Sequence, residues 1–164
     1  MSYDELKKLL GRKEEEAHLR AYRETGFWGR QAAGCLFFSL ESRRFGFAKR
    51  SRFVLDPGTH GTVGGAVNEG EPPEQTVLRE VVEEVGYDGP HELRWLDLFQ
   101  SGSFRYSTYL MLVPQEFAPA LNWENDGFLW VPHATWPDPV HPGLAVTLAK
   151  PNVREILDAL AGLR

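Results

Sequence analysis

The chain has 164 residues, of which 42% are hydrophobic and 25% are charged, and its formal net charge is −5. These values are typical of one soluble globular domain, because a chain of this length can enclose a sizeable core. The negative charge argues against a general nucleic-acid-binding protein, which needs a basic surface. No apolar run approaches the roughly 20 residues that span a bilayer, and the first residues lack the pattern of a signal peptide. We therefore expect a cytoplasmic protein.

The first part of the chain predicts helix followed by a strand hairpin. Residues 3–24 are rich in Leu, Lys, Glu and Ala, so we expect a helical N-terminal extension over about residues 1–25. The apolar run at residues 32–40 predicts a buried strand, with residues 45–49 as its hairpin partner. Cys35, the single cysteine, lies in this run and is expected to be a core residue rather than a nucleophile.

Glycine and proline residues divide the middle of the chain. The segment from residue 61 to residue 65 contains three glycines and predicts a tight loop. A helix is expected from Pro73 to Val85, because proline is tolerated in a first helical turn. Gly86 then suits the left-handed conformation that ends many helices.

The remaining residues predict three more strands and a helical C-terminal region. Strands are expected over residues 93–99, 105–113 and 127–131, and helices over residues 144–163 with a break near Pro151. Trp95 and Trp130 lie inside strand patterns and are expected in the core. Together the elements predict an α/β fold in which a mixed sheet lies between helices, with residues 1–164 forming a single domain.

The predicted central helix has an acidic face. At 100° per residue, Glu83 and Glu84 fall about 60° and about 40° on either side of Glu80, so the three carboxylates share one face. A separate apolar stripe, formed by Leu78, Val81, Val82 and Val85, can pack against the sheet. Clustered carboxylates repel one another, and a hard cation such as Mg²⁺ would turn this repulsion into coordination. A solvated acidic helix would show the same pattern.

The spacing around this helix is far more specific. From Gly65 the chain has five residues, Glu71, seven residues, and then the run Arg79-Glu80-Val81-Val82-Glu83-Glu84-Val85-Gly86-Tyr87. This run matches every fixed position of the Nudix box, G-x5-E-x7-R-E-U-x-E-E-x-G-U, in which U is a bulky apolar residue. The chain therefore resembles the Nudix hydrolase family (MutT-like), with the box at residues 65–87 and a similar order of elements over roughly residues 30–150.

The resemblance implies a role for each residue of the box. Glu80, Glu83 and Glu84 would bind Mg²⁺ or Mn²⁺, together with a backbone carbonyl near Gly64. Glu71 and Arg79 would form a pair that holds these glutamates in place, which suits the fork geometry of arginine and carboxylate. Gly64 and Gly65 would allow a substrate phosphate to approach the backbone closely. One departure is Val63, which occupies a position where family members often have proline.

Residues outside the box are less constrained by the pattern. In some family members the general base lies in a loop before a late strand that contains tryptophan, and Glu124 occupies that position here. The alternatives are that Glu80 or another box glutamate is the base and that Glu124 is a solvated loop acid. Arg50 and Arg52 belong to a basic strip over residues 42–53. They would bind a substrate phosphate, unless they only form an exposed strand face.

The resemblance implies a hydrolase that cleaves the diphosphate linkage of a nucleoside diphosphate joined to another moiety. NTPs or dNTPs, nucleotide sugars, ADP-ribose and dinucleoside polyphosphates all have this linkage. The alternatives are a non-catalytic nucleotide-sensing module, an isomerase on the same fold and a purely structural acidic helix. Specificity lies in loops outside the box, so the sequence does not name the substrate. It also leaves open whether the chain is a monomer or a homodimer.

Overall fold

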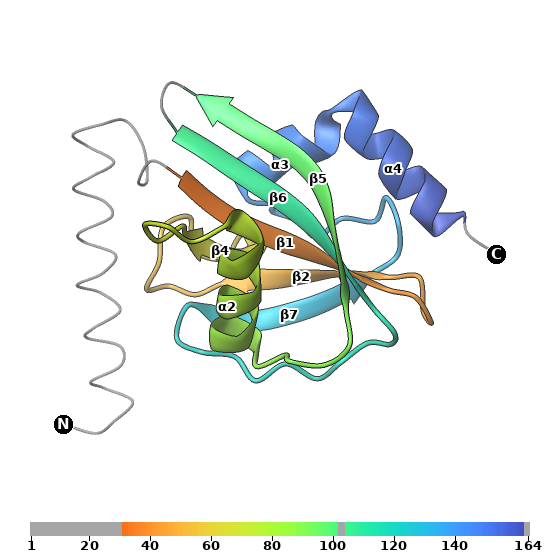
Figure 1. Cartoon of the computed structure of the whole chain (residues 1–164). Helices are drawn as coiled ribbons and strands as arrows, with labels where there is room; N and C mark the ends of the chain where they lie inside the picture. Colours follow the sequence, from red (N-terminus) through yellow and green to blue (C-terminus); the bar gives the residue numbers. More distant parts are fainter. Residues whose placement is uncertain (1–30, 102–103, 163–164) are drawn as a thin grey trace.

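The computed structural model describes residues 31–101 and 104–162, and the predicted N-terminal helical extension over residues 1–25 lies outside them (Figure 1). The strands are β1 (Gln31–Ser39), β2 (Phe45–Arg50), β3 (His60–Gly61), β4 (Val63–Ala66), β5 (Glu92–Ser101), β6 (Phe104–Val113) and β7 (Asn125–Val131). The helices are α2 (Pro73–Val85), α3 (Pro142–Ala149) and α4 (Pro151–Ala161). The predicted strand hairpin, three later strands and C-terminal helices all correspond to these elements.

One mixed sheet organises the fold. Its strand order is β3-β2-β1-β6-β5, and in addition β4 pairs with β1 and β7 pairs with β2. The β1–β6 pair is parallel, whereas the other pairs are antiparallel. Residues Ala32 to Ser39 of β1 are all buried, which is typical of a strand that is covered on both faces of a sheet.

Helices cover the two faces of the sheet (Figure 1). On one face the valines of α2 pack with the odd-numbered residues of β1; this cluster includes Ala33, Cys35, Phe37, Val77, Val81 and Val85. On the other face α3 and α4 pack with the even-numbered residues; this cluster includes Leu36, Phe38, Phe45, Leu144, Leu148, Val153 and Leu157. Because successive side chains of a strand point to opposite faces, β1 contributes to both clusters. The predicted sheet between helices is confirmed.

Local signals set the bounds of α2. The helix begins with Pro73 and ends at Val85, as predicted. Gly86 follows with φ 68° and donates its N–H to the Val82 carbonyl at 3.0 Å, which satisfies one of the last helical carbonyls. The predicted break near Pro151 is also confirmed, since α3 ends at Ala149 and α4 begins at Pro151.

The predicted tight loop at residues 61–65 is wrong. Gly61 belongs to β3, which pairs with β2, and Gly64 and Gly65 belong to β4, where they pair with Gly34 and Ala33 of β1. Glycine has little intrinsic strand preference, so the local pattern predicts a loop. The strand forms because β1, thirty residues earlier in the sequence, offers an edge to pair with.

Two predictions of burial are also wrong. Trp95 is 57% exposed, because β5 is the last strand in the order β3-β2-β1-β6-β5 and α2 packs over β1 and β4 instead. Beyond Trp95 the register of β5 shifts, and both Leu96 and Asp97 are buried. An irregularity of this kind breaks the in–out alternation that the prediction assumed. Val82 lies at the edge of the apolar stripe of α2 and is 51% exposed. Trp130, in contrast, packs against the core on the α2 face, and Cys35 is fully buried as predicted.

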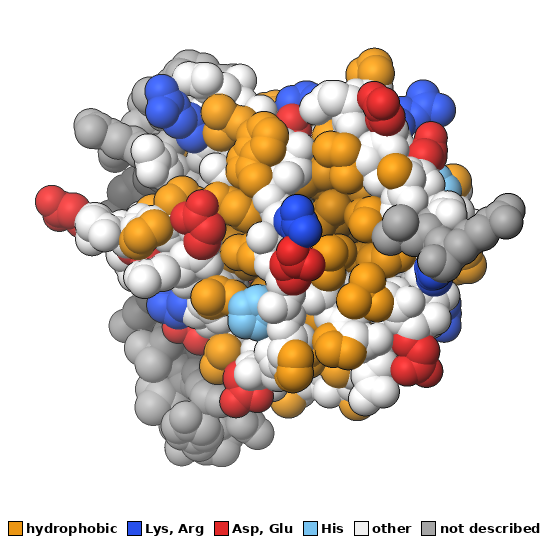
Figure 2. Space-filling model, turned by 45° about the vertical axis from the view of Figure 1, so that its right-hand side comes forward, with side chains coloured by type: hydrophobic (Ala, Val, Ile, Leu, Met, Phe, Trp, Pro, Cys, Tyr) orange, Lys and Arg blue, Asp and Glu red, His pale blue; other side chains and the backbone are white. Residues whose placement is uncertain are grey.

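Several large hydrophobic side chains lie on the surface: Leu40, Val82, Trp95, Leu98, Leu121, Leu129, Val146 and Ile156. Figure 2 shows hydrophobic side chains gathered over one face of the molecule, with a cationic and an acidic side chain next to each other near its centre. Apolar atoms cover much of any protein surface, so this exposure assigns no function by itself. Among the helices of the described residues, none combines the length and the apolar character that a membrane span requires.

Candidate active site

The close approach of β4 to α2 depends on glycine. A Cβ on Gly65 would lie 2.4 Å from Oε1 of Glu80, and a Cβ on Gly64 would lie 2.3 Å from the carbonyl oxygen of Ala33. The Gly64 N–H donates to Oε2 of Glu84 at 2.8 Å. In an antiparallel strand the N–H and C=O of one residue point to the same side, so the Gly64 carbonyl also points away from β1. Backbone polar groups of β4 therefore face the glutamates of α2.

The three glutamates of the helix differ in exposure. Glu80 and Glu84 are buried, with exposed fractions of 8% and 4%, whereas the side chain of Glu83 is 54% exposed. The valines on the opposite side of α2 fix this orientation, because they are buried against the sheet. The three carboxylates of the predicted acidic face therefore differ in exposure: those of Glu80 and Glu84 are buried, and that of Glu83 is exposed at the rim.

A third carboxylate, that of Glu124, comes from a segment that is distant in the sequence. Glu124 directly precedes β7, and its carboxylate, with those of Glu80 and Glu84, forms a group whose ligand atoms all lie within 4.8 Å of one another. We call these three residues the acidic cluster. Glu83 is not a member of it, but it lies beside Glu80, because Nη1 of Arg79 is 2.8 Å from Oε1 of Glu80 and 3.7 Å from Oε2 of Glu83.

Glu84 is the most constrained member of the acidic cluster. Its Oε1 accepts a hydrogen bond from Nδ2 of Asn125 at 3.0 Å, and its Oε2 accepts the Gly64 N–H. Burial raises the pKa of Glu84 well above its ordinary value, and the negative charges of Glu124 and Glu80 raise it further. A divalent cation would remove the repulsion that these three acids impose on one another. Carboxylate oxygens are the ligands that Mg²⁺ and Mn²⁺ prefer, so the donor set fits such an ion.

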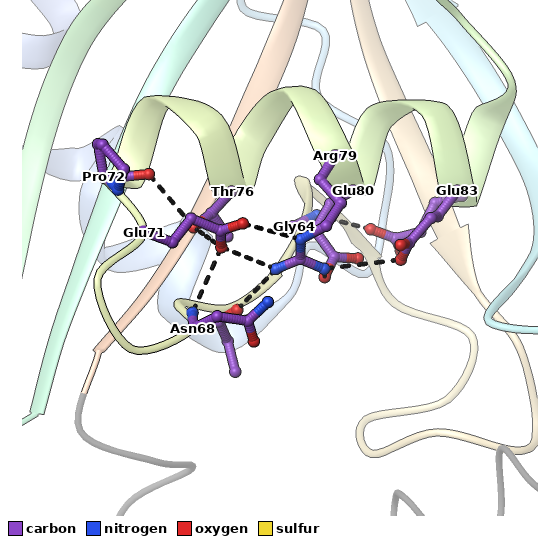
Figure 3. A network of polar contacts seen from close by, with 10 residues as sticks. Gly64, Asn68, Glu71, Pro72, Thr76, Arg79, Glu80 and Glu83 are labelled. Atoms are coloured by element: carbon purple, nitrogen blue, oxygen red, sulfur yellow. Dashed lines mark hydrogen bonds and ion pairs between the residues drawn. The ribbon is translucent and has the colours of Figure 1, made fainter.

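The predicted pair of Glu71 and Arg79 is confirmed (Figure 3). Nε of Arg79 donates to Oε2 of Glu71 at 3.1 Å, and Nη2 donates to Oε1 at 3.0 Å. Thr76 Oγ1 also donates to Oε1 of Glu71, at 2.6 Å, and Nη2 of Arg79 reaches the Ala66 carbonyl at 3.1 Å. The hydrogen bonds from Arg79 and then from Thr76 lower the pKa of Glu71 to about 2. This network leaves Nη1 of Arg79 directed at Glu80.

The two candidate phosphate-binding arginines occupy different positions. Arg50, at the end of β2, lies opposite Asn125 in the sheet and is half-buried. Its Nε donates to the Leu55 carbonyl at 2.6 Å, which fixes the direction of the guanidinium. Arg52 is exposed, and its guanidinium carbon lies 4.8 Å from the ring centroid of Phe53. Of the two, Arg50 is therefore the one that the sheet holds next to the acidic cluster.

Two buried polar residues of this region escape prediction from the sequence. Asn125 binds Glu84, and Ser51 binds the carbonyls of Trp123 and Glu124. Asn125 immediately follows Glu124, and its place two residues before the predicted strand at residues 127–131 was the available signal. Ser51 offers none, because its partners lie more than seventy residues later in the chain.

Similarities to known proteins bear on the family and the fold of the chain. The chain matches the NUDIX domain model over residues 28–150. It is similar to the solved structure of a Nudix hydrolase from M. smegmatis, RenU, with 23% identity, a TM-score of 0.66, and coverage of 84% of this chain and 92% of that chain. A C. elegans Ap4A hydrolase gives 18% identity, a TM-score of 0.58, and coverage of 80% and 99%. The E. coli dihydroneopterin triphosphate pyrophosphohydrolase gives 19% identity, a TM-score of 0.56, and coverage of 80% and 94%.

No curated protein matches the chain. At these identities the likeness to solved structures establishes the fold alone, whereas the domain match covers most of the chain and includes the complete box. The predictions of family and fold made from the box spacing are confirmed. The chain belongs to the NUDIX domain family.

Proposed function

We propose that the protein is a divalent-metal-dependent hydrolase that cleaves the diphosphate linkage of a nucleoside diphosphate joined to another moiety. The acidic cluster is the observation that carries this proposal. Three carboxylates from two distant segments approach within 4.8 Å of one another, and two of them are buried. Such an arrangement is unfavourable without a cation, because burial and like charge both oppose ionisation.

Glu80, Glu84 and Glu124 would hold the ion, with the Gly64 carbonyl and Glu83 at the border of the site. A bound Mg²⁺ or Mn²⁺ would neutralise charge on the diphosphate and lower the pKa of a bound water. The protein's own hydrogen bonds orient these ligands: Asn125 and the Gly64 N–H hold Glu84, and Arg79 holds Glu80. Ligands held in this way bind a metal with little reorganisation.

Two members of the acidic cluster compete for the role of proton acceptor. The closeness of Glu124 to Glu80 and Glu84 favours a ligand role for Glu124, and Glu80 would be the base only if its carboxylate does not bind the ion directly. Arg50 would bind a phosphate of the substrate, because its Nε is directed by Leu55 and its terminal nitrogens offer paired donors. Arg52 and Gly65 would border the same phosphate site.

The substrate class remains a nucleotide with a diphosphate linkage. The relatives with solved structures carry names that refer to different compounds, Ap4A in one and dihydroneopterin triphosphate in another. A shared fold therefore does not select between an NTP or dNTP, a nucleotide sugar, ADP-ribose and a dinucleoside polyphosphate.

A hydrolysis screen over these four classes tests the proposal. Each compound is incubated with the protein and Mg²⁺, Mn²⁺ or EDTA, and products are separated by ion-exchange chromatography. We expect metal-dependent formation of a nucleoside monophosphate from at least one class, and loss of that activity in Glu84→Gln. Nucleotide binding without turnover under every metal condition would instead support the non-catalytic sensing module.

A further inference from the structure

Ser51 holds the backbone on which Glu124 is mounted. It follows β2 directly and is 3% exposed. Its Oγ donates to the Trp123 carbonyl at 2.7 Å, and its N–H donates to the Glu124 carbonyl at 2.9 Å. One buried residue therefore binds the carbonyls on both sides of the Cα of Glu124.

The regular sheet does not hold this position. β7 begins at Asn125, so Glu124 lies just outside the strand. The register between β2 and β7 also shifts there, because Lys49 lies opposite Gly127 whereas Arg50 lies opposite Asn125. Irregularities of this type redirect side chains and interrupt the ladder of hydrogen bonds. The two bonds from Ser51 continue the cross-strand pairing beyond the irregularity.

The position of Glu124 needs such support. Its carboxylate lies in the acidic cluster, where the charges of Glu80 and Glu84 repel it. The backbone N–H of Glu124 donates to Oδ1 of Asn122 at 3.0 Å, which is a bond within its own loop. The bonds from Ser51, in contrast, attach that loop to β2 and hence to the sheet.

We propose that Ser51 is a positioning residue for Glu124. Its hydroxyl and N–H fix the backbone of residues 123 and 124, so that the carboxylate of Glu124 stays in the acidic cluster with Glu80 and Glu84. The same residue joins the strand end that carries Arg50 to the loop that carries Glu124. This inference rests on the proposed function, in which Glu124 is a ligand of the metal.

Ser39 provides a matched control for the substitution. Ser39 is also fully buried, and its Oγ accepts the Ser42 N–H at 3.2 Å, as the Oγ of Ser51 accepts the Phe53 N–H at 3.2 Å. Ser39 lies at the opposite end of β1, in the hairpin with β2, away from the acidic cluster. Ser51→Ala and Ser39→Ala therefore each remove one buried hydroxyl, but only Ser51→Ala removes a hydrogen bond to the loop of Glu124.

The first measurement is the dissociation constant of Mn²⁺ alone, by calorimetry, with kcat and KM measured alongside. We expect Ser51→Ala to weaken Mn²⁺ binding by about fivefold to tenfold, the size expected from one lost hydrogen bond. We expect kcat to fall by a similar factor while KM stays within about twofold. Ser39→Ala should leave the Mn²⁺ constant and kcat unchanged. Equal effects of the two substitutions would overturn the inference.

The second measurement asks whether Ser51 acts through Glu124. In the Glu124→Gln background, Ser51→Ala should have no further effect on Mn²⁺ binding, because the carboxylate that it positions is gone. Additive effects would show a general structural role and would contradict the proposal. If Glu124→Gln alone left Mn²⁺ binding and turnover intact, the metal role of Glu124 would fail, and this inference would fail with it. An impaired Glu124→Gln together with a neutral Ser51→Ala would remove only the role of Ser51.

A third pair of variants covers the case in which Ser51→Ala does not fold. Ser51→Thr keeps the hydroxyl, and Ser51→Val has nearly the same shape as Ser51→Thr but lacks the hydroxyl. We expect Ser51→Thr to bind Mn²⁺ more tightly than Ser51→Val by about fivefold, because the two variants differ by one hydrogen bond. Equal Mn²⁺ affinity in the two variants would contradict a role for the hydroxyl.

Discussion

At the scale of the single residue, Glu84 combines deep burial with an acidic side chain in a cluster of acids. Its side chain is buried beside two other acids, and both of its oxygens accept hydrogen bonds from groups that favour the ionised form. The hydrogen bond from Asn125 therefore opposes the effect of burial on the pKa of Glu84, although burial is the larger effect. A carboxylate in such surroundings is stable as an anion when a cation is present.

Glu84→Gln is expected to lower kcat by at least about a hundredfold, or roughly 3 kcal/mol of activation barrier. Glutamine keeps the shape and one oxygen acceptor, so thermal unfolding should show a folded protein. Glu83→Gln, at the exposed rim, should lower kcat by a smaller factor. Glu69→Gln is the control, since Glu69 is an exposed acid of the same segment. Turnover of Glu84→Gln within a few fold of wild type would show that the acidic cluster is not the reaction centre.

At the scale of the element, the contact of β4 with α2 determines whether the glutamates have room. Gly65→Ala would place a Cβ 2.4 Å from Oε1 of Glu80, so this carboxylate must shift. A displacement of about 1 Å in a reaction centre can cost about a hundredfold in rate. We expect kcat of Gly65→Ala to fall by about that factor, with a small change in melting temperature.

Gly86→Ala gives the complementary result. Gly86 ends α2 with φ 68°, a left-handed conformation that costs other residues about 1 kcal/mol or more. Its Cβ would also lie 2.9 Å from Cβ of Ala120. We expect a lower free energy of unfolding in urea and an unchanged kcat. The opposite pattern in the two variants, with Gly86→Ala losing activity and Gly65→Ala losing stability, would contradict the division between reaction centre and helix end.

The pairing of Glu71 with Arg79 makes the stability of the fold depend on pH in a predictable direction. The folded-state pKa of Glu71 is lowered to about 2 from an ordinary value of 4.5. Because the folded protein favours the ionised form, this pairing stabilises the fold above about pH 4.5, and the contribution is lost as the pH falls from 4.5 towards 2. Glu71→Gln should therefore be less stable than wild type at pH 7, and the difference should shrink below pH 4.5. Urea unfolding at pH 7 and at acid pH measures this difference in the free energy of unfolding. A difference that does not change with pH would rule out the charge of Glu71 as its cause.

Elements with local signals were predictable from the sequence, and those that depend on distant partners were not. Pro73 and Gly86 mark both ends of α2 within the helix itself. β4 depends on pairing with β1, and the exposure of Trp95 depends on the position of β5 at the end of the strand order, which no local pattern reveals. In the site, the resemblance to the Nudix box predicted the pair of Glu71 and Arg79. Ser51 was missed because its role exists only through contact with the loop before β7.

At the scale of the whole molecule, the two faces of the sheet have separate tasks. α2 and the acidic cluster occupy one face, whereas α3 and α4 cover the other. Asp97 of β5 attaches this second layer to the sheet. It is buried, it lies 2.9 Å from Nζ of Lys150 at the junction of α3 and α4, and it accepts a hydrogen bond from Thr147 at 3.2 Å. Stability and activity should therefore respond to different substitutions.

Lys150→Met tests this separation. Removing the cation leaves the buried carboxylate of Asp97 with Thr147 as its hydrogen-bond partner among residues 31–101 and 104–162, and breaking a buried pair in this way costs about 3 kcal/mol. One third of the Lys150 side chain is exposed, so we expect a smaller loss, about 2 kcal/mol, in the free energy of unfolding. Adding Asp97→Leu should recover part of this loss, since the unpaired charge is then gone. Mn²⁺ affinity and kcat should stay at the wild-type level in the folded protein, because the ion pair lies in the layer that faces away from α2. A large fall in Mn²⁺ affinity would show that the α3–α4 layer also shapes the acidic cluster.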